Sequence, residues 1–236
     1  MNGCVKTIFF ILLAILPTLA ADPGVVESKY AERDVALDLN AASPFWQASS
    51  KSYMERDSFG KTVTSYRTEV RTRWTKNNLY FLFICPFDQL HLKPNPDTHK
   101  ETNELWNWDV AEVFLGSDFT EIKRYKEFEV SPQGEWIDLD IDLRNPHHED
   151  GWTWNSGFEA VASIDQQRHV WYAAMRIPLA AIDARPAVAG NTLRLNLFRS
   201  QGPPGNLHEI TWQPPMSKTF HVPEKFGLLK LVASER

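Results

Sequence analysis

Residues 105–115 read LWNWDVAEVFL, and the second half of this stretch alternates in character. From residue 109 onward, D, A, V and L fall on one face of an extended strand, and V, E and F fall on the other. Trp106 and Trp108 lie where the strand begins, near the carboxylate of Glu112. A flat apolar ring beside a hydrogen-bonding acid suits a sugar. Tryptophans are mostly buried, however, so a core role for Trp106 and Trp108 stays open.

The rest of the chain reads as short strands separated by turns, with helical turns over 43–48 and 178–182. Hairpin-like pairs predominate, and no amphipathic stretch separates consecutive strands, so a parallel α/β fold is not expected. We predict an all-β protein, an antiparallel β-sandwich of jelly-roll type formed by residues 22–236 as a single domain. The other predicted strands are 35–39, 65–74, 79–85, 125–130, 136–143, 158–164, 170–177, 193–198, 209–212 and 226–231.

The first 21 residues have the pattern of a secretory signal peptide. Lys6 supplies the positive charge, residues 7–16 are almost wholly apolar, and small residues at Thr18 and Ala20 fit a cleavage site after Ala20 or Ala21. The apolar run is short for a membrane span, and no later stretch approaches one. We therefore expect a secreted or periplasmic protein that has no membrane segment after cleavage.

Charge and cysteine content exclude several classes of function. The formal net charge is −5, and it becomes −6 when Lys6 is removed with the leader, which disfavours nucleic acids and anionic membranes as partners. Cys85 would be the only cysteine left, and its apolar strand predicts a core position. Hydrolase, phosphate-binding and paired-cysteine metal motifs are absent, so we expect a protein that is not an enzyme.

Three aspartates suggest a cation site. Asp138, Asp140 and Asp142 share one face of the predicted strand 136–143, where like charges repel unless a cation, an arginine or solvent relieves them. Calcium suits oxygen ligands and an exported protein, so Asp138 and Asp140 are candidate calcium ligands. The alternative is an acidic row that faces solvent.

Tryptophan is abundant, with 9 residues in the chain. Trp46, Trp74, Trp136 and Trp171 are embedded in element patterns and are expected in the core. Trp106, Trp152 and Trp154 lie at junctions between loops and strands, where a sandwich usually presents binding groups.

Taken in order, the motifs resemble family 9 carbohydrate-binding modules. An opening segment with Asp38 leads into a helical turn that carries Trp46, and an Asp-x-x-Glu-Val-Phe strand follows Trp106. The resemblance implies a jelly-roll-like sandwich related to DOMON-type domains, which hold sugars or haem. It is carried by residues 36–48, 79–81, 106–114, 177–178, 210–212 and 223–231.

The resemblance also implies a binding site. Two aromatic rings, which correspond to Trp106 and Phe220, would clamp the terminal sugar of a glycan, and Glu112 would accept hydrogen bonds from its hydroxyls. Glu129 occupies the position of the family's sugar-binding arginine, and an acceptor cannot replace a guanidinium donor. We include Glu129 in the candidate site for this reason, with Trp108 and Trp154 as further aromatic candidates.

Three functions remain open. The first is non-catalytic binding of a polysaccharide, in concert with glycan-degrading enzymes encoded separately. The second is a DOMON-type haem-binding redox domain, with axial ligands from Met54, Met175, Met216 or the histidines, none of which lies in a haem motif. The third is a structural or partner-binding sandwich without affinity for sugars, which the glutamate at position 129 suggests.

Overall fold

A computed structural model describes residues 24–234, so the predicted signal peptide lies outside the described residues. The helices are short: α1 (Pro44–Gln47), α2 (Leu179–Ile182) and the 3-10 turns η1 (Leu105–Asn107), η2 (His148–Thr153) and η3 (Pro223–Lys225). The strands are β1 (Val25–Tyr30), β2 (Ser50–Met54), β3 (Thr68–Trp74), β4 (Asn78–Pro86), β5 (Val110–Gly116), β6 (Arg124–Val130), β7 (Trp136–Asp142), β8 (Glu159–Asp165), β9 (Val170–Pro178), β10 (Thr192–Gln201), β11 (His208–Thr211) and β12 (Gly227–Val232). The predicted all-β class is confirmed.

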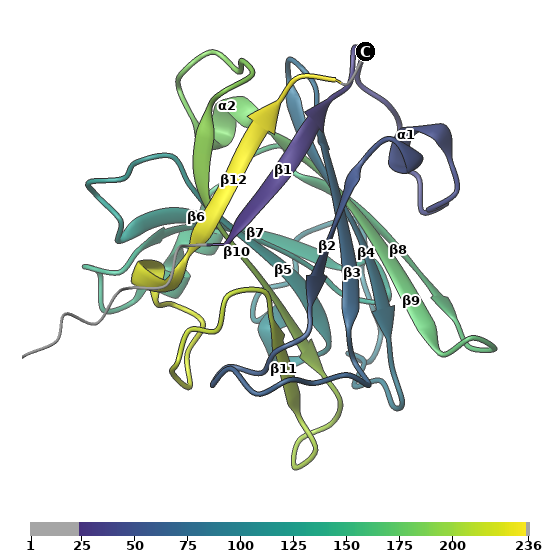
Figure 1. Ribbon diagram of the computed structural model, residues 1–236. Helices are drawn as coiled ribbons and strands as arrows, with labels where there is room; N and C mark the ends of the chain where they lie inside the picture. The colour runs from purple at the N-terminus through teal and green to yellow at the C-terminus, as the bar shows by residue number, and fades with distance from the viewer. Residues whose placement is uncertain (1–23, 235–236) are drawn as a thin grey trace, which may run out of the picture.

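The strands follow one continuous path in the order β7-β6-β5-β10-β12-β1-β3-β4-β9-β8, with β2 added to β3 and β11 added to β10. Most neighbours are antiparallel, but β1 pairs in parallel with β12 over five residues and with β3 over two. Figure 1 shows β1 beside β12, although they lie at opposite ends of the chain. The sheet is therefore mixed, and β1 joins its two halves.

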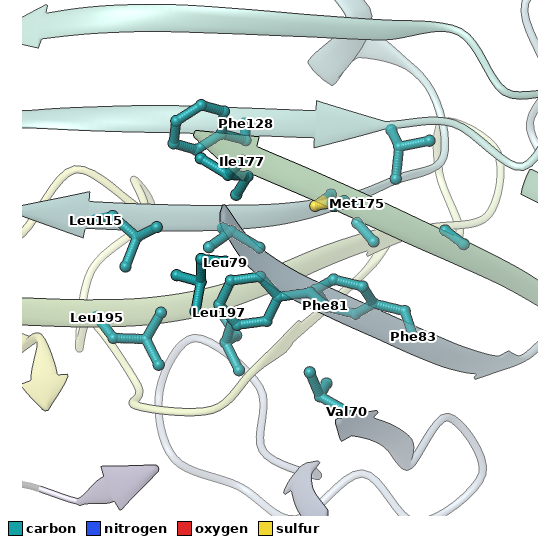
Figure 2. Packing of buried hydrophobic residues seen from close by; sticks show 14 of the residues in the cluster. Val70, Leu79, Phe81, Phe83, Leu115, Phe128, Met175, Ile177, Leu195 and Leu197 are labelled. Atoms are coloured by element: carbon teal, nitrogen blue, oxygen red, sulfur yellow. The ribbon is translucent and has the colours of Figure 1, made fainter. Parts of the chain in front are cut away.

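The two halves enclose the main hydrophobic core. Alternation on β5 directs Ala111, Val113 and Leu115 into it, and every second residue of β4 and β10 joins them. Figure 2 shows Phe81 and Phe83 of β4 in the same cluster as Leu195 and Leu197 of β10. Cys85 and Trp171 are fully buried there, as the sequence predicted, and Trp74 is 3% exposed.

One predicted strand is wrong. Residues 35–39 alternate in polarity, but the structure gives them no strand. The Val35 amide donates to the Tyr80 hydroxyl (3.2 Å), and the Asp38 carbonyl accepts from the Trp46 indole (2.7 Å), so side chains replace strand partners here. Val35, Leu37 and Leu39 instead pack with the buried Trp46 over the outer face of β4.

A second hydrophobic cluster covers the other face of β5, β6, β7 and β10. All seven residues of β5 are buried, because this strand has apolar neighbours on both sides. The second cluster consists of Leu105, Val110, Phe114, Tyr125, Ile137, Leu139, Ile141, Phe198 and Phe226.

Among residues 24–234, no helix is long and apolar enough to cross a membrane.

Candidate functional site

A pocket of about 620 Å³ opens above the second cluster. Its floor is formed by side chains of β5, β6, β7 and β10, and its walls come from η1, the η2 turn, β11 and the segment 218–221. These segments are far apart in the chain and meet here because β5 and β10 are neighbours in the sheet. The lining residues are Glu104, Trp106, Asn107, Glu112, Phe114, Glu127, Leu139, Ile141, His148, Glu149, Ser200, Leu207, Glu209, Lys218, Thr219, Phe220 and His221.

Strand alternation directs Glu112 and Phe114 toward this pocket, away from the main core. Trp106 reaches it from η1, which follows Glu104, a residue with left-handed backbone geometry (φ 59°). The turn ends at Trp108, whose extended backbone leads into β5. Residues 105–115 thus supply one wall and part of the floor.

Trp106 and Phe220 both line the pocket and are both partly buried against the second cluster. Phe220 lies flat on Phe198 of β10, with ring centroids 4.2 Å apart and planes inclined by 7°. This stacking fixes the orientation of the Phe220 ring. The structure therefore brings to one pocket the two rings that the resemblance paired.

Glu112, Glu127 and Glu129 form a buried acidic cluster at the base of the pocket. Glu112 lies opposite Glu129 in the β5–β6 register, and Glu127, two residues before Glu129, lies on the same face of β6. One carboxylate oxygen from each lies within 4.8 Å of the others. The three residues are 2%, 3% and 0% exposed, respectively.

Burial raises the pKa of all three carboxyls. It raises that of Glu127 to about 7, and it raises those of Glu112 and Glu129 well above the usual value. For Glu112, the nearby charges of Glu127 and Glu209 add to the effect of burial, and for Glu129 those of Glu112 and Glu127 do so. Each carboxyl at the base of the pocket therefore favours its neutral, protonated form, and a ligand that brings positive charge would favour the ionised form.

His221 closes one side of the pocket. Its Nδ1 and the Tyr125 hydroxyl share a hydrogen bond of 2.6 Å, and its ring lies edge-on to His148 with centroids 4.6 Å apart. Burial lowers the pKa of His221 to about 4, helped by the charge of His148. His221 is therefore neutral at pH 7.

Trp108 and Trp154 do not line this pocket. Trp108 stacks on His91, with centroids 4.5 Å apart. Trp154 packs against the main core near Phe128, and the Lys126 ammonium lies 4.3 Å from its ring centroid. Each ring packs against a neighbour, and neither lines the pocket at Trp106.

Asp138 and Asp140 point to the face of β7 opposite the pocket. Asp138 is buried and accepts hydrogen bonds from the amide (2.8 Å) and hydroxyl of Ser156. Asp140 forms an ion pair with Lys126 (2.6 Å). Calcium binding by this pair stays a prediction, and each carboxylate already has a partner in the fold.

The methionines considered as haem ligands are not gathered at the pocket. Met54 and Met175 are fully buried in the main core, and Met216 is exposed on a loop.

Several residues that line the pocket were not predicted from the sequence, among them Glu127, Leu139, His148 and His221. The alternation of residues 125–130 places Glu127 and Glu129 on one face, and that signal could have identified Glu127.

Comparison with known proteins gives consistent results. Structures of a family 9 carbohydrate-binding module from Caldicellulosiruptor kristjanssonii, solved with cellotriose and with glucose, are 13% and 14% identical to this chain. Their TM-scores are 0.62 and 0.63, and each alignment covers 90% of this chain and 95% or 97% of the module. A structure of a putative carbohydrate-binding protein from Bacteroides uniformis has a TM-score of 0.68 at 14% identity, covering 89% of this chain and 100% of the other.

Two sequence comparisons extend these structural ones. A protein from Arthroderma benhamiae described as "Extracellular protein" is 23% identical over 190 residues, covering 74% of this chain and 84% of the relative. Residues 40–234 match the model of a family described as "Carbohydrate family 9 binding domain-like", which spans most of the chain, including every wall of the pocket. The chain therefore belongs to the carbohydrate family 9 binding domain-like family.

Proposed function

We propose that this protein is an exported, non-catalytic carbohydrate-binding protein, and that it holds a glycan in the pocket at Trp106 and Phe220. The observation that carries the proposal is the pocket itself, in which two partly buried aromatic rings border buried carboxylates. Family membership and the sugar complexes of the structural neighbours from Caldicellulosiruptor kristjanssonii support it. The relative described as extracellular supports export.

In this proposal the rings and the acids have different tasks. The faces of Trp106 and Phe220 cover the C–H surfaces of a sugar ring, each contributing about 1 kcal/mol beyond area burial. Glu112 accepts hydrogen bonds from hydroxyls at the sugar's edge. Two stacking faces and a few hydrogen bonds correspond to a dissociation constant between about 1 μM and 1 mM. The volume of about 620 Å³ accommodates a short segment of a glycan rather than a whole polymer.

A glycan array followed by calorimetry tests the proposal. We expect wild-type protein to retain at least one class of glycan, and Phe220→Ala to lose that retention. Phe119→Ala is the matched control, because Phe119 is 52% exposed and does not line the pocket. A folded wild-type protein that retains no glycan, or a Phe220→Ala variant that binds like wild type, would contradict the proposal.

A further inference from the structure

We propose that Glu112, Glu127 and Glu129 form a binding site for a divalent cation, with calcium as the expected ion, at the base of the pocket. One oxygen from each residue lies within 4.8 Å of the other two. Ligand oxygens lie about 2.3–2.6 Å from a bound calcium ion, so two of them can be at most about 5 Å apart. The spacing of the three oxygens therefore matches a shared ion.

The unpartnered oxygens of these residues are a second, independent observation. Glu127 and Glu129 share a hydrogen bond, but among residues 24–234 no amide, amine or hydroxyl group donates to either oxygen of Glu129, or to one buried oxygen each of Glu112 and Glu127. A buried carboxylate oxygen without a partner is costly, and most such oxygens in folded proteins are bonded. A cation shared by the three carboxylates would give these oxygens a partner.

No basic side chain fills this role in the described part of the chain. The charged groups that act on Glu112, Glu127 and Glu129 there are other carboxylates, including Glu209. Lys218 lines the same pocket, but on the exposed segment that forms its wall. The cluster thus places acidic groups side by side without a countercharge, and a small cation fits between them.

The donor set favours calcium over softer metals. Three carboxylates supply up to six oxygens and no nitrogen or sulfur, which suits hard cations. Glu112 and Glu127 line the pocket, whereas Glu129 lies beneath it. A bound ion would therefore have free coordination positions on the pocket side, where vicinal hydroxyls of a sugar could enter. Only this sugar-facing role, in which the bound ion contacts a sugar, rests on the proposed function; the cation site itself does not.

Calorimetric titration of the metal-free protein with CaCl₂ tests the cation site without any glycan. We expect saturable binding by wild type, and a rise in thermal midpoint of about 5–10 °C at a calcium concentration 100 times the dissociation constant. Glu129→Gln keeps the side-chain shape and should lower calcium affinity at least tenfold, as should Glu127→Gln if the first variant does not fold. Glu32→Gln is the matched control, because Glu32 is exposed and does not line the pocket, and it should bind calcium like wild type.

Absence of calcium binding by folded wild-type protein, or wild-type affinity in both Glu129→Gln and Glu127→Gln, would overturn the cation site. Glycan retention measured with and without EDTA tests the sugar-facing role separately. Loss of retention on chelation supports that role, and unchanged retention overturns it. A protein that binds calcium but retains no glycan under any condition would count against the proposed function while leaving the cation site supported.

Discussion

Replacement of Trp106 by alanine separates a binding residue from a core residue. The indole is partly buried against the second cluster, so a sugar would cover only its remaining surface. That surface is worth about 1 kcal/mol of apolar burial, and ring stacking adds about 1 kcal/mol. A loss of about 2 kcal/mol corresponds to an affinity about 30-fold weaker. For a ligand that binds in the micromolar to millimolar range, this loss removes retention on an array.

The same substitution should cost little stability. A fully buried tryptophan replaced by alanine costs about 3–5 kcal/mol, and the partial burial of Trp106 reduces this to about 1–2 kcal/mol. The thermal midpoint should therefore fall by about 2–8 °C. Trp108→Ala is the matched control, because Trp108 stacks on His91 outside the pocket, and it should bind glycan like wild type.

Isothermal titration with the glycan found on the array, combined with thermal unfolding, gives both quantities. Unchanged affinity in Trp106→Ala together with a large fall in its midpoint would refute the reasoning, because Trp106 would then serve only the core. Equal losses of affinity in Trp106→Ala and Trp108→Ala would also refute it, since the effect would not be specific to the pocket.

Three further predictions concern stability and side-chain reactivity rather than glycan binding. Trp46→Ala should lower the free energy of unfolding by about 3–5 kcal/mol in denaturant titrations and leave glycan affinity unchanged, because Trp46 is 1% exposed on the far side of β4. The Cys85 thiol, whose pKa burial raises to about 12, should resist iodoacetamide at pH 8 until the protein is unfolded, and rapid labelling of native protein would contradict its core position. Burial lowers the pKa of His221 to about 4, so the free energy of unfolding should decrease as the pH falls from 6.5 to 4. In this range the unfolded chain binds a proton at His221 and the folded chain does not. That contribution is at most about 3 kcal/mol, and the difference between wild type and His221→Asn should vary with pH over this range; a constant difference would contradict it.

The strands and faces that the sequence predicted correctly are those with strong local patterns. The alternation of residues 109–115 placed Glu112 and Phe114 on one face and Val113 on the core face, as the structure shows. Strand β1 was missed because it has no hairpin partner nearby in the chain and pairs in parallel with distant strands. Residues 35–39 were predicted as a strand because alternation says nothing about whether a partner strand exists.

The pocket was harder to predict than the fold. The motif around Trp106 identified one wall, but the approach of Phe220 to Phe198 depends on the path of a long segment after β11. The opposition of Glu112 and Glu129 depends on the β5–β6 register, which is set by the loop between these strands. Trp154 was a candidate because it lies at a loop junction, and the structure places its ring against Phe128 and Lys126, outside this pocket.

The indole N–H resonances of the protein give the most direct test of the proposed binding site. In ¹⁵N-labelled protein titrated with a retained glycan, we expect the Trp106 resonance, assigned with the Trp106→Phe variant, to move most. The resonances of Trp46 and Trp171, which are buried away from the pocket, should stay in place. A titration in which the glycan binds while the Trp106 signal does not move would contradict the account.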